Sequence, residues 1–298
     1  MPSEEMQRII DMVPATAPFN SGDLKTRRES LDFIGIAVSE IEGSTYQDVL
    51  ANSIEAQWIN VPNGQDHSKV LLYLHGGGYS VGSIISHRRL AGKIADSAKL
   101  DRALIPNYRL APENPYPGAI EDALSIYKWL VNDQNVSPDQ IVVAGDSAGG
   151  GLCAALLLSI KQNGLDMPGG AVFLSPWLDL TGSGESAKTR RDRDPMLTPE
   201  MLDDFAAIYC QGQVALTEPL VSPLFGDFAG FPKCLIQVGD AEILLSDSTR
   251  FHEKLIEAGV NATIEIFDDM IHVFQIFGGM APEPTEAVSK IGNWIEQL

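Results

Sequence analysis

The chain of 298 residues is 44% apolar and 20% charged, and its 40 acidic against 21 basic residues give a formal net charge of −19. This length suits one α/β domain with an appended cap, and the negative charge would repel nucleic-acid phosphates and anionic lipid head groups. We therefore expect no nucleic-acid partner, and a solvated surface accounts for the charge.

The sequence also argues against a membrane or exported protein. The longest uninterrupted apolar run, residues 152–158, is far shorter than a membrane span, and the N-terminus is acidic where a signal peptide needs basic residues. Cys153, Cys210 and Cys234 have no CxxC spacing and suit buried thiols better than disulfides or a metal site. We expect a cytoplasmic protein without membrane insertion.

Residues 1–45 show helical periodicity in two segments. In the first, apolar residues recur at helical spacing before Pro14, and in the second they do so after a start signal at residues 20–22. No catalytic residue types cluster on either segment. We expect two helices that form part of a cap or, equally, an N-terminal packing extension.

The sheet is expected to begin at about residue 57, and residues 70–74 (VLLYL) predict a buried strand that runs into the sequence HGGGY at 75–79. Consecutive glycines at a strand end are costly unless the backbone adopts conformations closed to other residues or something approaches it closely. An oxyanion hole needs both, because backbone amides must point at the negative charge that develops in acyl transfer. We expect His75 to orient this loop rather than to act as a base.

Helical and strand patterns then alternate. Residues 88–99 and 119–131 predict helices, whereas residues 102–108 and 141–145 predict strands, and this alternation implies parallel strands joined by crossover helices. In the loop between them, we expect Arg109 and Glu113 to form a structural ion pair.

Residues 145–149 read Gly-Asp-Ser-Ala-Gly between the apolar run 141–144 and the helix-favouring run 152–158. A strand, a tight turn and a helix in this order lift a serine hydroxyl out of the sheet, and small flanking residues let the backbone and helix pass. Ser147 is therefore a candidate nucleophile.

Regularity falls after residue 180. Residues 181–193 predict a loop, residues 199–211 a helix, and residues 220–225 a return to the core. An insertion at the carboxyl end of a parallel sheet often shapes the substrate pocket, but the sequence does not identify the lining side chains.

Where the nucleophile lies on a strand–turn–helix of this kind, the acid and the base follow it along the chain in the order Ser, Asp or Glu, His. Only His252 and His272 follow Ser147; the first falls within a predicted helix, residues 248–258, whereas His272 lies in a loop after the predicted strand 262–267. We expect His272 to be the base and His252 to be a surface residue. The predicted strand 234–239 precedes three candidate acids: Asp240, Glu242 and Asp247.

Four blocks together carry a resemblance: HGGGY at 75–79, YRLAPENPYPGAIED at 108–122, GDSAGG at 145–150 and SPWLDLT at 175–181. From about residue 70 onward the chain resembles the hormone-sensitive-lipase-like esterases, bacterial family IV of the α/β-hydrolases. The resemblance implies an α/β-hydrolase fold, with a mostly parallel central sheet flanked by helices. Residues 46–298 would form the catalytic domain, and residues 1–45 with an insertion at 183–225 the helical cap.

The resemblance also implies roles for individual residues. It makes Ser147 the nucleophile and assigns the backbone amides of Gly77, Gly78 and Ala148 to the oxyanion hole. His272 matches the base, with Val273 in place of the commoner glycine of that block. Asn114 stands where the family often has histidine, outside the catalytic set.

The acid depends on spacing from the histidine. Family members commonly have Asp-Pro-Leu at this point, which favours Asp240, but aligning residues 257–260 and His272 with the family places the acid 30 residues before the histidine, at Glu242. Glutamate can perform the task of holding the imidazole in the required tautomer. We predict Glu242 with Asp240 as the alternative, and Asp247 as a helix N-terminal residue or a residue behind the site.

These residues predict a serine carboxylesterase that works through an acyl-enzyme, with a small-molecule ester as its partner and no cofactor or metal. The resemblance implies esters of short to medium acyl chains. An amidase or acyltransferase with the same triad is an alternative, as is a non-catalytic small-molecule receptor on this fold. A homodimer paired through an edge strand is compatible with the architecture.

Overall fold

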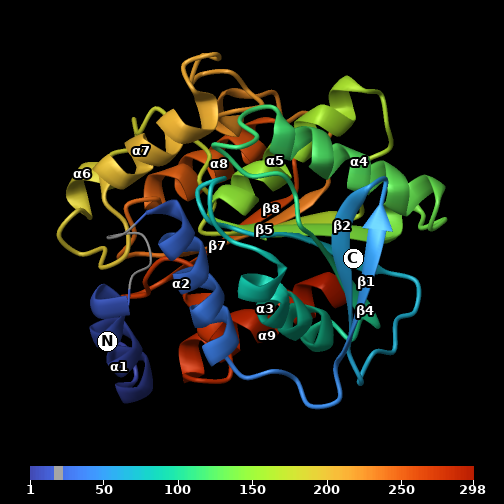
Figure 1. Ribbon diagram of the computed structural model, residues 1–298, viewed down its shortest axis with the longest axis horizontal. Helices are drawn as coiled ribbons and strands as arrows, with labels where there is room; N and C mark the ends of the chain where they lie inside the picture. The colour runs from blue at the N-terminus through green and yellow to red at the C-terminus, as the bar shows by residue number, and fades with distance from the viewer. Residues whose placement is uncertain (17–22) are drawn as a thin grey trace.

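An eight-stranded sheet forms the centre of the computed structural model, which describes residues 1–16 and 23–298 (Figure 1). In order across the sheet, the strands are β1 (Thr45–Ala51), β2 (Ile54–Asn60), β4 (Arg102–Pro106), β3 (Val70–Leu74), β5 (Ile141–Asp146), β6 (Gly170–Leu174), β7 (Lys233–Gly239) and β8 (Ala262–Phe267). β2 pairs antiparallel with both β1 and β4, and all other neighbours are parallel. The predicted α/β-hydrolase architecture with a mostly parallel sheet is confirmed.

Helices cover both faces of the sheet. On one face lie α3 (Ile84–Ser97) and α9 (Pro282–Glu296), and on the other α4 (Gly118–Asn132), α5 (Ala148–Gln162) and α8 (Leu245–Glu257). The sequence of β3 is apolar throughout because the strand is buried on both faces. Leu72 and Leu74 face the α5 side, whereas Leu71 and Tyr73 face the α3 side. Strands buried on both faces need apolar residues at every position.

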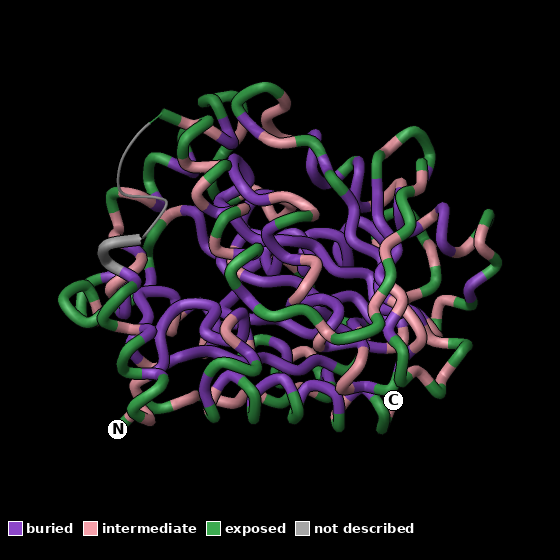
Figure 2. Tube along the Cα trace, turned by 60° about the horizontal axis from the view of Figure 1, so that its bottom comes forward, coloured by how far each residue is buried: buried purple, intermediate pink, exposed green. Residues whose placement is uncertain are grey.

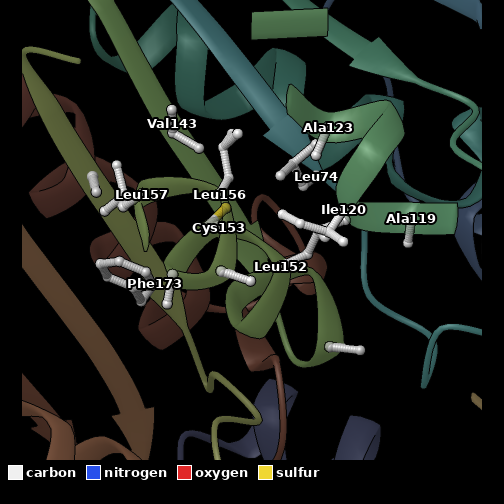
Figure 3. Close-up of a cluster of buried hydrophobic side chains, with 14 of the residues drawn as sticks. Leu74, Ala119, Ile120, Ala123, Val143, Leu152, Cys153, Leu156, Leu157 and Phe173 are labelled. Carbon is white, nitrogen blue, oxygen red and sulfur yellow. The ribbon is translucent and has the colours of Figure 1, made fainter. Parts of the chain in front are cut away.

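Helix α5 fits close to the sheet because its inner residues are small or aliphatic. Figure 3 shows side chains of α5, among them Leu152 and Leu156, in one cluster with side chains of β3, β5, β6 and α4. Cys153 is one of these side chains, and all three cysteines are free and buried. Figure 2 shows the buried residues concentrated in the middle of the molecule, with exposed residues toward its outline.

Two N-terminal helices, α1 (Glu4–Thr16) and α2 (Leu24–Ala37), lie outside these layers (Figure 1). The predicted start signal at residues 20–22 falls outside the described residues. Asp23 caps α2, because its carboxylate accepts a hydrogen bond from the amide of Thr26 at 2.9 Å. α2 packs against α3, and α1 against α9.

Residues 181–225 contain a one-turn helix, α6 (Ser186–Thr189), inside the predicted loop, followed by α7 (Pro199–Cys210) and the 3₁₀ turn η2 (Pro223–Phe225). Two further 3₁₀ turns are η1 (Pro138–Gln140) and η3 (Phe274–Phe277). The expectation of a helix over 199–211 is confirmed to within one residue. Thr198 caps α7 by accepting from the amide of Met201.

The sheet begins earlier than the sequence predicted, at Thr45 rather than near residue 57. β1 was missed because most of its residues are exposed or half-exposed, so it lacks the apolar alternation of a half-buried strand. β6 was also not anticipated. β1 and β8 are the edges of the sheet, and pairing of such an edge in a dimer stays a prediction. Within the described residues, no helix is long and apolar enough to cross a membrane.

Candidate active site

Ser147 occupies the sharp turn between β5 and α5. Its backbone has φ 52° and ψ −123°, a conformation that residues with a side chain rarely adopt. The turn is held by the Ser147 amide, which donates to the Leu174 carbonyl at 2.9 Å, and by close packing at Gly149. A Cβ on Gly149 would lie 2.1 Å from the carbonyl oxygen of Leu74. The glycine therefore lets α5 start directly above the end of β3.

The loop after β3 lies beside this turn. Gly77 has φ +117° and Gly78 has φ +59°, both in the region that favours glycine, and a Cβ on Gly77 would lie 2.2 Å from the carbonyl oxygen of Val81. The amides of Gly77, Gly78 and Ala148 donate to no acceptor within residues 1–16 and 23–298. Ala148 is also the first residue of α5, where the helix dipole favours negative charge. These amides are therefore available to an acceptor beside Ser147, which an oxyanion hole requires.

His75 is fully buried beneath the same loop. Its Nδ1 lies 2.8 Å from the carbonyl oxygen of Gly76, and its ring stacks on Tyr108 at 4.3 Å between ring centroids. Burial and the neighbouring His87 lower the pKa of His75 to about 3, so the imidazole is neutral and donates to Gly76. These contacts agree with the predicted orienting role.

His272 and Glu242 meet after β8 and β7. The Nδ1 atom of His272 lies 2.7 Å from Oε2 of Glu242, and both side chains are buried. Burial opposes a charge on the imidazole, but the hydrogen bond and the charge of Glu242 outweigh it, so the pKa of His272 lies above its ordinary value of 6.5. His272 lines the same cavity as Ser147.

The Glu242 carboxylate is fixed by two further donors. Its Oε1 atom accepts from the Ser175 hydroxyl at 2.7 Å and from the Gly239 amide at 2.6 Å. The Ser175 hydroxyl in turn accepts from the amide of Val273, the residue after the histidine. Ser175 was not identified from the sequence, although it opens the SPWLDLT block.

The other two candidate acids lie elsewhere. Asp240 points away from His272 to the protein surface, where it pairs with Arg193 at 3.2 Å and accepts from the amide of Asp269 at 2.7 Å. Asp247 lies in the first turn of α8 and accepts from the amides of Leu178 and Asp179. Burial raises the pKa of Asp247 to about 7. Of the three carboxylates, the structure brings only Glu242 to His272.

The Ser147 hydroxyl and His272 make no direct hydrogen bond in this structure. Contacts between a nucleophile and its base are often long in free enzymes and shorten when substrate binds. The Nε2 atom of His272 has no hydrogen-bond partner in the described part of the chain, so it is available to a proton donor in the cavity.

A second buried pair was not anticipated from the sequence. Nε2 of His87 lies 3.3 Å from Oδ2 of Asp146, and the other oxygen of this carboxylate accepts from the Tyr73 hydroxyl at 2.7 Å and from the Gly76 amide at 3.0 Å. Burial alone would raise the pKa of Asp146, but His87 and Tyr73 more than offset this and lower it. The pair ties the nucleophile turn to the glycine loop.

Asp194 is another residue that sequence reasoning missed. Its buried carboxylate accepts from the amides of Met196 and Leu197, at 2.9 and 3.0 Å, and from the amide of Ile243 at 2.9 Å. It therefore links a wall of the cavity to the residue after Glu242. Its only sequence signal was an Asp-Pro pair shortly before the predicted helix at 199.

One expectation about other residues needs correction. Arg109 does not pair with Glu113; it binds Asp122 and Glu121 at the start of α4, whereas Glu113 binds Arg28 of α2. His252 is partly exposed on α8, as expected of a surface residue.

The cavity above Ser147 has a volume of about 600 Å³. Its floor is formed by Ser147, His272, Gly77 and Gly78, and its walls come from α1, α2, the 196–205 segment and the 276–280 turn. The apolar side chains of these walls include Ile9, Met12, Val13, Phe33, Ile34, Ala37, Val38, Met196, Leu197, Leu202, Phe205, Ile276, Phe277 and Met280. The N-terminal helices thus cover the site.

Comparisons with known proteins agree with this architecture. Residues 71–276 match the Abhydrolase_3 family model, described as an alpha/beta hydrolase fold. The chain is 34% identical over 295 residues to the acetyl-hydrolase of Streptomyces hygroscopicus, which covers 99% of this chain and 97% of that protein.

Two solved structures are also similar. One is an esterase from the bacterial hormone-sensitive lipase family, with a TM-score of 0.95 and 36% identity over 100% of this chain and 99% of that one. The other is the crystal structure of EstE5 soaked with p-nitrophenyl butyrate, with a TM-score of 0.93 and 38% identity over 99% and 98%.

Proposed function

The chain belongs to the hormone-sensitive lipase family of α/β-hydrolase esterases and is a carboxylic ester hydrolase, and on this premise we propose a specific mechanism. Ser147 is the nucleophile, His272 the general base and Glu242 the acid that orients the base. The observation that carries the proposal is the 2.7 Å contact between His272 Nδ1 and Glu242 Oε2 in a pair whose histidine lines the cavity of Ser147.

The tautomer of His272 determines the first step. A carboxylate can only accept, so with Glu242 as its partner Nδ1 carries the proton and Nε2 offers a lone pair to the Ser147 hydroxyl. The Ser147 oxygen attacks the ester carbonyl as its proton moves to Nε2. Glu242 stabilises the imidazolium that forms, which agrees with the raised pKa of His272.

The negative charge on the former carbonyl oxygen rests on the amides of Gly77, Gly78 and Ala148. Each amide of this kind is typically worth about a hundredfold to a thousandfold in rate. The alcohol then leaves with the proton from His272, and water repeats the sequence on the acyl-enzyme to release the acid.

We further propose short- to medium-chain acyl esters as substrates. The cavity volume of about 600 Å³ lies within the range of small-molecule sites, and its walls are mainly apolar. Residues 1–45 and 183–225 act as the cap, because their side chains supply much of the wall above Ser147.

Ser147→Ala tests the nucleophile. With p-nitrophenyl butyrate we expect kcat to fall on the order of ten-thousand-fold or more, as for other serine hydrolases. Ser289→Ala, an exposed serine on α9, is the matched control. Undiminished turnover by Ser147→Ala would overturn the proposal.

A series of p-nitrophenyl esters tests the substrate class separately. We expect kcat/KM to be higher for acetate, butyrate and octanoate than for palmitate, and higher for esters than for the matching anilides or for transfer to an added alcohol. A maximum at palmitate would contradict the chain-length proposal while leaving the mechanism intact. A preference for anilides would indicate an amidase instead.

A further inference from the structure

Helix α2 has one face that lines the cavity and another that packs against the catalytic domain. Thr26, Glu29, Ser30, Phe33, Ile34 and Ala37 recur at helical spacing and line the cavity. Arg28, Asp32 and Gly35 form a second stripe that faces the segment after the glycine loop and the start of α3.

The second stripe fixes α2 against the start of α3. The Asp32 carboxylate accepts from the hydroxyl of Ser83, the residue that caps α3. A Cβ on Gly35 would lie 2.4 Å from the backbone of Ser86, so the two helices touch backbone to backbone here. α2 therefore occupies a defined position relative to α3.

Arg28, in the same stripe of α2, reaches the segment that follows the glycine loop. Its Nε donates to the Ser80 carbonyl at 2.9 Å and its Nη2 to the Ala111 carbonyl at 3.2 Å. The two terminal nitrogens also bind the Glu113 carboxylate at 2.9 and 2.8 Å. A planar guanidinium with donors in a fixed fork can hold all three partners at once.

Ser80 and Ala111, whose carbonyls accept from Arg28, also donate backbone hydrogen bonds to the glycine loop. The Ser80 amide donates to the Gly77 carbonyl at 3.1 Å, and the Ala111 amide donates to the Tyr79 carbonyl at 2.9 Å. The two residues whose carbonyls accept from Arg28 thus also make hydrogen bonds to the segment that carries the Gly77 and Gly78 amides. The cap helix and the oxyanion loop are joined through a single side chain.

We propose that Arg28 is a positioning residue for the oxyanion loop, an inference that rests on the proposed function. Oxyanion amides stabilise the transition state only if they are fixed before charge develops, and small displacements are costly in rate. By holding Ser80 and Ala111 from outside, Arg28 fixes the direction of the Gly77 and Gly78 amides. The cap is therefore part of the catalytic geometry as well as a cover for the substrate.

Arg28→Ala tests the proposal through transition-state binding. The Ser147 oxygen adds to the carbonyl carbon of an alkyl trifluoromethyl ketone while its proton passes to His272, and the resulting hemiketal oxyanion binds the same amides. We expect kcat with p-nitrophenyl butyrate to fall about tenfold to a hundredfold, less than for complete loss of one oxyanion donor. The inhibition constant of the ketone should rise by the same factor, while KM changes less than about threefold because ground-state binding is retained.

Two controls separate positioning from general stability. Glu113→Gln removes the exposed carboxylate but leaves both carbonyl contacts of Arg28, so we expect kcat within about twofold of wild type, since exposed ion pairs contribute little. Lys99→Ala removes an exposed pair of similar length, with Glu296 at 2.7 Å, between two residues that do not line the cavity, and should leave the ketone affinity unchanged. Arg28→Lys keeps the charge without the fork and should show an intermediate loss.

Several results would overturn the inference. These are wild-type kcat and ketone affinity in Arg28→Ala, an equal loss in Glu113→Gln, or a rise in KM with kcat unchanged. If Arg28→Ala does not fold, Arg28→Lys decides, since unchanged ketone affinity there contradicts the proposal. Ser147→Ala distinguishes this failure from that of the proposed function: a normal Arg28→Ala beside an inactive Ser147→Ala rejects only the role of Arg28.

Discussion

Two buried histidine–carboxylate pairs stand close to Ser147, and they differ in which histidine nitrogen remains available. In His272–Glu242 the carboxylate binds Nδ1, and Nε2 is free to take a proton. In His87–Asp146 the carboxylate binds Nε2, and the Ser86 hydroxyl binds Nδ1 at 2.8 Å. Both histidines line the cavity, so position alone does not identify the base.

The carboxylates differ in the same way. Glu242 is fixed by Ser175 and Gly239 and serves one histidine, whereas Asp146 also binds Tyr73 and the Gly76 amide and so joins two loops. A buried histidine–carboxylate pair beside a serine therefore does not by itself identify the base. An unoccupied ring nitrogen that faces the cavity is the distinguishing feature.

The largest expected effect compares the two histidines directly. We predict that His272→Ala lowers kcat on the order of ten-thousand-fold. His87→Ala should lower it only about tenfold, because Asp146 loses one partner and holds the glycine loop less rigidly. Steady-state kinetics with p-nitrophenyl butyrate measure both. Equal losses in the two variants would remove the distinction.

The acids give the next effect. Glu242→Gln keeps the size of the side chain but cannot stabilise the imidazolium, so kcat should fall about a thousandfold to ten-thousand-fold. Asp240→Asn loses only a half-exposed pair with Arg193 and should stay within about threefold of wild type. A large loss confined to Asp240→Asn would reassign the acid.

The pH dependence sharpens the comparison further. Since the base acts in its neutral form and Glu242 raises the pKa of His272, kcat/KM of the wild type should fall with decreasing pH at a midpoint above 6.5. In Glu242→Gln this acid limb should move to lower pH, because the charge that favours the imidazolium is gone. An unmoved limb would mean that another group titrates.

The smallest effect concerns Asp194, whose carboxylate binds amides of the cavity wall and the amide of Ile243, next to Glu242. Asp194→Asn turns one oxygen into an N–H donor that opposes a buried amide, and we expect a loss of about 1–3 kcal/mol in unfolding free energy, seen as a lower Tm. Because Asp194 also favours the charged form of His272, the acid limb should shift slightly to lower pH. Asp66→Asn, a half-exposed carboxylate with similar amide contacts, is the control and should lower Tm less.

The features that could be predicted are those encoded in residues close together in the sequence. The buried strand 70–74, its glycine loop and the turn at Ser147 are written in consecutive residues, and chain order favoured His272. Glu242 needed the spacing of the family, because Asp240 and Glu242 follow the same strand and are equivalent by composition. The His87–Asp146 pair joins a helix to a strand end far along the chain, and no local pattern indicates it.

Nearness in sequence also misled. Arg109 and Glu113 are four residues apart, which would bring them together on a helix, but they lie in a loop interrupted by Pro112. Arg109 turns to Asp122, and Glu113 turns to a helix at the other end of the chain. The cavity walls were beyond prediction for the same reason, since they combine helices α1 and α2 with residues 196–205 and 276–280.

The central claim is that Ser147 carries the acyl group during turnover, and trapping the intermediate tests it most directly. The enzyme would be mixed rapidly with p-nitrophenyl butyrate, quenched in acid within the first turnovers, digested and examined by peptide mass spectrometry. We predict a butyryl group on Ser147 in the wild type, with markedly slower accumulation in His272→Ala than in His87→Ala. A butyryl group on a different residue, or rapid hydrolysis by a protein whose Ser147 is never acylated, would contradict the account.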